Sequence, residues 1–117
     1  MQQIVDLQAE ADELHAMLQA RPDADFERVT QFKAWTIDDV LRHLHVGDTM
    51  ASLSVTEPDA FQRYLTDVRA KRANGLSPRD DARQRFGHLG GAKLLAAWRR
   101  KLDDLCVLHP IPLSSAP

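Results

Sequence analysis

The side chains best able to do chemistry in this sequence are five histidines and one cysteine: His15, His43, His45, His88, His109 and Cys106. His43 and His45 are two positions apart, which on a helix separates their side chains by about 200°. They therefore cannot hold one metal ion together from a single helix. Because no His-x-x-x-His, Glu-x-x-His or Cys-x-x-Cys spacing occurs, the sequence contains no complete metal-binding motif by spacing alone.

His43 is the histidine with the best position for a role in a site. Its helical neighbours place it at the border of an apolar helix face, and helical bundles build metal sites from inward side chains donated by different helices. Asp39, one turn earlier, could accept a hydrogen bond from the second ring nitrogen of His43 and so orient it. The same aspartate could instead serve the start of the helix. His45 points to another face, and we expect it at the surface.

The elements that must position these residues are helices. Apolar residues recur at spacings of three and four, which predicts helices at 2–20, 36–53, 57–73 and 78–86 and a last helix carrying Leu94, Trp98 and Leu102. The stretch 21–34 has no sustained period and is predicted to be a loop. Glycines at 87, 90 and 91 are expected to separate the last two helices.

Three helix starts carry capping signals. Thr36 followed by Asp39, Thr56 followed by Asp59, and Ser77 followed by Pro78 and Asp80 each pair a hydroxyl with an acid three residues later. No alternating strand pattern competes with the helices. The sequence thus predicts an all-α protein, an antiparallel four-helix bundle formed by residues 1–108, with residues 109–117 as an extended tail.

Composition indicates which classes of partner and which cellular compartment to expect. The net charge is −2 and the pI is about 6.2, so we expect no nucleic-acid partner, although helices 57–73 and 78–86 could imitate a helix-turn-helix. No run of eighteen apolar residues and no basic-then-apolar leader occur, so we expect no membrane association. A single cysteine, expected to be packed, fits a reducing compartment and predicts a cytoplasmic protein.

The segment Thr30-Gln-Phe-Lys-Ala-Trp35-Thr-Ile-Asp-Asp-Val-Leu-Arg-His43-Leu resembles a signature of the DinB-like superfamily, specifically of mycothiol-dependent maleylpyruvate isomerase-like proteins. Thr56–Phe61 and Leu94–Arg99 are similar to an uncharacterised metal-binding branch of that group. The resemblance implies a four-helix bundle with a divalent metal, zinc or nickel. His43 would be the first ligand of this metal, and Asp39 would orient the His43 ring by a hydrogen bond. It also implies a low-molecular-weight thiol as cofactor.

The sequence departs from this family pattern after Leu105, where no downstream helix with further ligands follows. The chain resembles the front part of a longer family member, so His88, His109 or a second subunit would have to complete the coordination. Two functions stay open. One is a metal-binding, isomerase-like bundle of unknown specific activity. The other is a non-catalytic helical module with a vestigial site, which forms a homodimer to cover an apolar groove beside Trp98 and Leu102.

Overall fold

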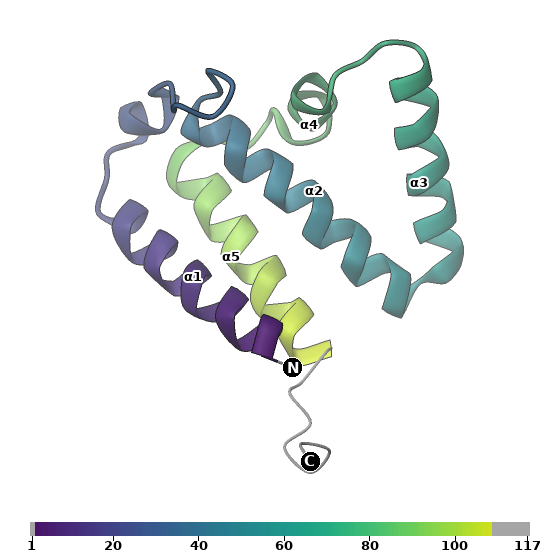
Figure 1. The fold of residues 1–117 in the computed structure, drawn as a ribbon, viewed down its shortest axis with the longest axis horizontal. Helices are drawn as coiled ribbons and strands as arrows, with labels where there is room; N and C mark the ends of the chain where they lie inside the picture. The colour runs from purple at the N-terminus through teal and green to yellow at the C-terminus, as the bar shows by residue number, and fades with distance from the viewer. Residues whose placement is uncertain (1, 109–117) are drawn as a thin grey trace.

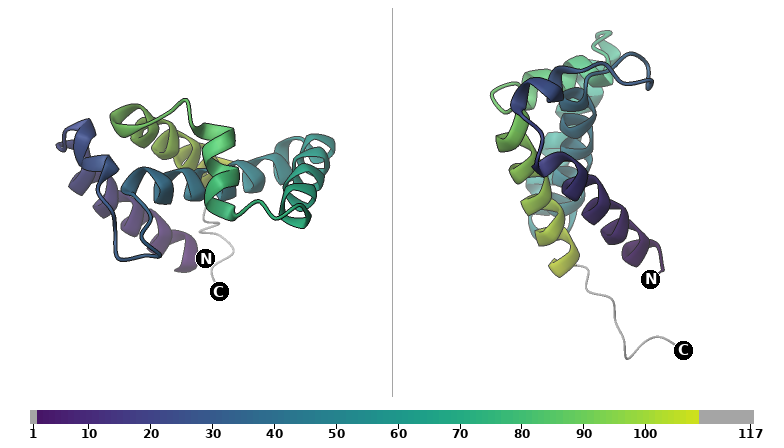
Figure 2. Two further views of the ribbon diagram at one scale, coloured as in Figure 1. Left: turned by 90° about the horizontal axis from the view of Figure 1, so that it is seen from above. Right: turned by 90° about the vertical axis from the view of Figure 1, so that its left-hand side faces the viewer.

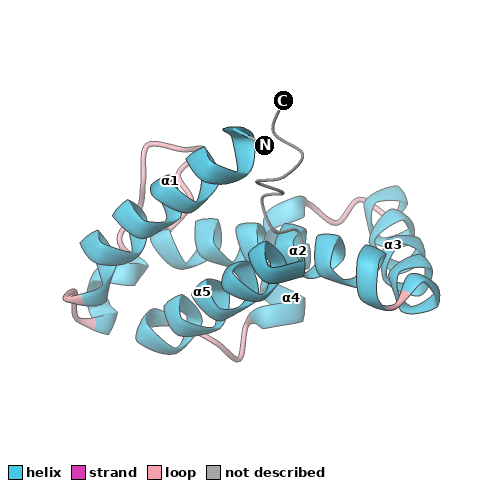
Figure 3. Cartoon of the chain, turned by 90° about the horizontal axis from the view of Figure 1, so that it is seen from below, coloured by secondary structure: helices cyan, strands magenta, loops and turns pink. Residues whose placement is uncertain are grey.

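The computed structural model describes residues 2–108, with side chains for residues 8–107. It contains five α-helices and one 3-10 helix (Figure 1): α1 (Gln2–Gln19), η1 (Asp23–Glu27), α2 (Ile37–Thr56), α3 (Pro58–Ala73), α4 (Pro78–Phe86) and α5 (Gly91–Leu108). Helices and their connecting loops make up the whole described range (Figure 3), apart from one isolated bridge between Val29 and Thr36. The predicted all-α fold is confirmed. The predicted tail at 109–117 lies outside the described residues.

Helix α5 lies between α1 and α2 (Figure 1), and α2 is the helix that contacts α3, α4 and α5. The most extensive contact of α5 is with α2, and α1 also packs against α5. Among the described residues, no Cα atom of α1 lies within 8 Å of a Cα atom of α2. Figure 2 shows α4 at one end of α2, leading through the turn that enters α5. The result is a helical bundle with α3 at its edge.

The hydrophobic core follows the apolar stripe predicted for the last helix. Trp98 is 3% exposed and Leu94 is fully buried, and they pack with residues of α1, η1 and α2. The buried cluster consists of Ala11, Leu18, Phe26, Leu41, Leu94, Leu95, Trp98 and Leu102. Burial of these side chains is the main driving force that holds α1 and α2 to α5.

Two of the three predicted helix starts are confirmed in atomic detail. The Thr36 side chain accepts a hydrogen bond from the Asp39 amide at 3.0 Å, and the Ser77 side chain accepts one from the Asp80 amide at 3.1 Å. The third helix does begin close to the predicted position, at Pro58, but the capping role predicted for Thr56 is wrong. Helix α2 continues through Thr56, whose hydroxyl donates to the Ser52 carbonyl, and a single residue, Glu57, separates it from α3.

The stretch predicted as a plain loop contains η1, which buries Phe26 completely. The Asp23 carboxylate accepts a hydrogen bond from the Ala92 amide at 2.9 Å and so closes η1 onto the start of α5. Gly91 is required at this closure. Its φ is +57°, and a Cβ atom there would come within 2.5 Å of the Asp23 carboxyl group.

Helix α3 has no fully buried residue; its large apolar residues are half-buried, and ion pairs join it to α4. Asp81 of α4, whose side chain is 1% exposed, contacts Arg72 of α3 at 3.0 Å and Arg85 of α4 at 2.8 Å. Arg85 also contacts Asp67 of α3 at 2.7 Å. The buried carboxylate of Asp81 is therefore the centre of the ion pairs at the α3–α4 junction.

We expect Asp81→Asn to lower the free energy of unfolding by about 2 kcal/mol, because it leaves two arginines facing a neutral group in a desolvated site. Asp80→Asn, at the neighbouring position where the side chain is 46% exposed, should change it by less than about 0.5 kcal/mol. Urea unfolding of both variants measures the difference. Equal effects would show that the buried carboxylate does not hold the junction.

Candidate functional site

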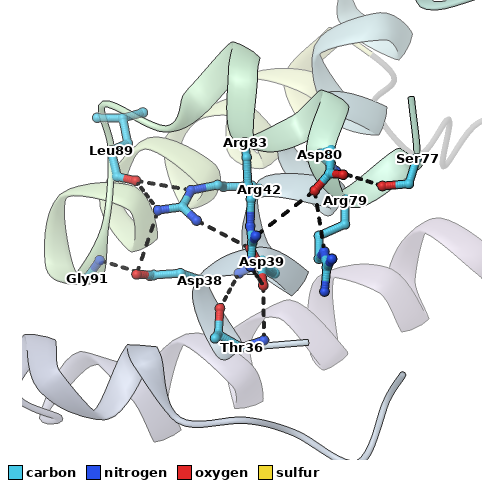
Figure 4. Close-up of polar contacts among 10 residues, drawn as sticks. All are labelled: Thr36, Asp38, Asp39, Arg42, Ser77, Arg79, Asp80, Arg83, Leu89 and Gly91. Carbon is cyan, nitrogen blue, oxygen red and sulfur yellow. Dashed lines mark hydrogen bonds and ion pairs between the residues drawn. The ribbon is translucent and has the colours of Figure 1, made fainter. Parts of the chain in front are cut away.

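The first turn of α2 carries a polar network in which Asp39 is the centre (Figure 4). Arg83 of α4 donates two hydrogen bonds to the Asp39 carboxylate, from Nε and Nη2, both at 2.8 Å. The Thr36 amide donates to the same carboxylate at 3.2 Å and completes a capping box. A bidentate arginine–carboxylate pair of this kind fixes both distance and orientation.

Arg42 and Asp38 extend the network to the start of α5 (Figure 4). Arg42 donates to the Leu89 carbonyl from Nη2 at 2.9 Å and from Nε at 3.2 Å. Asp38 accepts a hydrogen bond from the Gly91 amide at 2.9 Å. Two consecutive aspartates of α2 thus join α2 to α4 and to the first residue of α5, and Arg42 joins it to the turn before α5.

The two carboxylates are perturbed in opposite directions. Burial raises the pKa of Asp38, and the Gly91 amide and Arg42 counteract only part of that effect. Burial acts in the same sense on Asp39, but hydrogen bonds from Arg83 and Thr36 outweigh it and lower the pKa of Asp39 to about 2. Asp39 is therefore ionised and engaged at any physiological pH.

The role of Asp39 at the helix start, one of the two predicted for it, is confirmed by this capping box. Its oxygens contact Arg83, Arg42 and Thr36, and no hydrogen bond joins them to the His43 ring in the described part of the chain. The orienting role toward His43 stays a prediction.

His43 is exposed at the rim of an open groove of about 350 Å³. Its ring and the ring of the buried Trp35 meet in a T-shaped contact with 5.4 Å between centroids, and Phe32 makes a T-shaped contact with Trp35 at 5.1 Å. The groove is lined by Phe32, Lys33, Trp35, His43, Ser77, Pro78 and Arg79. His43 therefore has a packed ring on one side and open space on the other.

The loop that carries Trp35 is tightly closed and locally strained. The Thr30 amide donates to the Trp35 carbonyl at 2.6 Å, and the Trp35 amide donates to the Phe32 carbonyl at 2.9 Å. Lys33 and Ala34 between them have φ values of 52° and 59°, a left-handed conformation that costs a residue with a Cβ about 1 kcal/mol. The fold holds this strained turn against the base of the groove.

The surface position predicted for His45 is wrong. His45 is 6% exposed, and its ring packs against Phe86 of α4 with 4.4 Å between centroids. Burial lowers the pKa of His45, and the charge of Lys101 lowers it further. The prediction failed because the face of α2 that α4 covers is set by contacts distant in sequence.

The weaker metal-ligand candidates are His88 and His109. His88 is exposed in the turn between α4 and α5, and His109 lies outside the described residues. Across the described residues, no group of three histidine, cysteine, aspartate or glutamate side chains is arranged to hold a metal ion. Cys106 is a free, half-buried thiol whose pKa is raised by burial.

Sequence reasoning missed Asp48, which lines a second groove between α1 and α2 together with Glu10 and Leu44. Burial raises the pKa of Asp48 to about 6. The available signal was an aspartate inside the apolar stripe of the second helix, four residues after Leu44.

No helix in the described range has the length and apolarity needed to cross a membrane.

Comparisons with known proteins place these features in context. The family model for the mycothiol maleylpyruvate isomerase N-terminal domain matches residues 7–107. Two uncharacterized proteins of Mycobacterium tuberculosis, one from strain CDC 1551 and one from strain H37Rv, are each 32% identical over 96 residues. These matches cover 82% of this chain but only 36% of each relative. No solved structure matches the chain.

We expect Asp39→Asn to lower the free energy of unfolding at neutral pH by about 2 kcal/mol. With a folded pKa of about 2 and an unfolded pKa of about 3.9, the ionised carboxylate stabilises the fold above about pH 4. That contribution is lost as the pH falls through about 2. Urea unfolding between pH 7 and pH 2 should therefore show a steeper acid loss in the wild type than in the variant.

The matched control is Asp104→Asn, at an exposed position of α5, which should keep both the stability and the acid profile of the wild type. An Asp39→Asn variant with wild-type stability would contradict the central position of this carboxylate.

Proposed function

This chain belongs to the mycothiol maleylpyruvate isomerase N-terminal domain family of the DinB-like superfamily, and we propose that it is a metal-binding helical domain. In this proposal His43 supplies one ligand to a divalent ion, zinc or nickel, at the groove beside Trp35. The specific reaction is outside the proposal, because the chain spans about a third of the length of the curated relatives it matches.

The observation that carries the proposal is the environment of the His43 ring. A metal ligand needs an accessible nitrogen and a fixed ring plane, and His43 combines exposure with an edge contact to the buried Trp35. His45, the other histidine of α2, is buried against Phe86. On α2, the accessible nitrogen donor is thus the histidine at the position that the family resemblance marks as a ligand.

His43 alone does not make a metal centre. A zinc site that keeps a position open for water or substrate uses about three protein ligands, and the described residues offer no such group around His43. The proposal therefore requires further ligands from outside these residues, supplied by His109 or by a second copy of the chain. We assign no reaction step to an ion held in this way.

The groove beside His43 also suits a small polar cofactor. Lys33 and Arg79 place two positive charges at its lining, next to the aromatic faces of Phe32 and Trp35. We propose that a low-molecular-weight thiol, the cofactor class in the family's name, binds in this groove. A thiol cofactor requires reducing conditions, so the cytoplasm forms part of the same proposal.

A second candidate function is a non-catalytic helical module in which His43 is only a surface residue. The absence of a three-ligand group in the described part of the chain favours it. The two candidates differ in one measurable property, because only the first requires zinc to bind through His43.

We expect the purified, tag-free chain to bind zinc and His43→Ala to weaken that binding at least about 100-fold, because the variant removes a directly coordinating nitrogen. Isothermal titration calorimetry with a zinc salt gives affinity and stoichiometry. His15→Ala, on α1 away from the groove, is the matched control and should bind zinc as the wild type does.

Helical content and unfolding midpoint should be unchanged in metal-free His43→Ala, since the exposed ring contributes little to the core. A large loss of stability in metal-free buffer would mark His43 as a structural residue. Zinc binding that is equal in all three proteins, or absent from all of them, would favour the non-catalytic module.

A further inference from the structure

Residues of α1 and α2 line a depression on another face of the bundle, which we call the α1–α2 groove, and Trp98 and Leu102 of α5 line part of it. Figure 1 shows α5 between α1 and α2. Two cavities of about 150 and 280 Å³ lie along it and share Leu14 in their linings. The lining includes Ala11, Leu14, Met17, Leu18, Ile37, Val40, Leu41, Leu44, Trp98 and Leu102. The apolar groove expected beside Trp98 and Leu102 is therefore present.

Large apolar side chains at the rim of this groove reach solvent. Met17 is 59% exposed and Leu44 is 38% exposed, one on each wall. Large apolar side chains exposed on both walls of an apolar groove make that groove a candidate interaction surface. The walls stay apart along the described residues, so nothing in this part of the chain closes the groove.

The two ends of the groove carry opposite charge. Glu10 and Asp48 line one end. Burial raises the pKa of Asp48, and no cation acts against that effect. Arg21 and Arg28 line the other end, accompanied by a single acid, Asp25. The groove therefore runs from an acidic end to a net basic end.

We propose that a second copy of this chain covers the α1–α2 groove, with the two grooves facing each other and running in opposite directions. In a two-fold symmetric contact the same patch serves both partners. The acidic end of each groove then lies opposite the basic end of the partner's groove, and Met17 and Leu44 are removed from water in both copies.

The dimensions agree with this arrangement. Glu10 and Arg21 are eleven positions apart on and just after α1, which corresponds to about 16 Å along a helix axis. Ile37 and Asp48 have the same spacing on α2. Both walls thus offer about three helical turns between the acidic end and the end that carries Arg21 and Arg28, so an antiparallel copy can align along the whole groove.

Sedimentation equilibrium over about a hundredfold range of protein concentration, with a chelator present, tests the proposal independently of any metal. We expect a concentration-dependent dimer. Met17→Glu should raise its dissociation constant at least about 10-fold, because the variant places a charge at the centre of the covered face. Val107→Glu, at a 75% exposed position of α5 outside the groove lining, is the matched control and should leave the dissociation constant unchanged.

Charge reversal tests the antiparallel register. Glu10→Arg alone and Arg28→Glu alone should each weaken the dimer, and the double variant should recover wild-type affinity because opposite charges again meet. Circular dichroism checks that all variants keep their helices. A monomer at every concentration, a dimer unaffected by Met17→Glu, or a double variant no stronger than its single variants would each overturn the proposal.

Discussion

The contact on which the arrangement of this molecule depends is the bidentate pair between Asp39 and Arg83. It joins the first turn of α2 to α4 through two hydrogen bonds of 2.8 Å, at a carboxylate that the Thr36 amide also reaches. A buried carboxylate is stable only when its charge is compensated and its oxygens are hydrogen-bonded. This requirement fixes where α4 can lie, and the position of α4 decides which residues of α2 are covered.

Interactions between residues near in sequence could be predicted, because each needs only one helix turn. The caps at Thr36 and Ser77 span three residues, and the stripe that buries Leu94 and Trp98 repeats every three or four residues. The cap assigned to Thr56 failed because its hydroxyl donates a hydrogen bond to the Ser52 carbonyl inside the continuing helix. A capping pattern alone does not distinguish the beginning of one helix from the end of another.

Features that depend on distant partners could not be predicted in the same way. Phe26 is buried because η1 is closed onto α5 by an Asp23–Ala92 hydrogen bond that spans 69 positions. His45 is buried because α4 covers it, and α4 is held by a pair 44 positions apart in sequence. The candidate site shows both cases. The Trp35-to-His43 segment carries a family signature in its sequence, whereas the groove beside it requires the strained loop and the start of α4.

Three consecutive residues of helix α2 have three different surroundings. Side chains on a helix turn by about 100° per residue, so His43, Leu44 and His45 must point in three directions. His43 lies in the groove beside Trp35, Leu44 lines the α1–α2 groove, and His45 packs on Phe86. The ligand proposed at His43 and the second copy proposed at the α1–α2 groove would therefore use separate faces of one helix. The contact between His45 and α4 lies on a third face of α2, so it holds the helix without covering either of the other two.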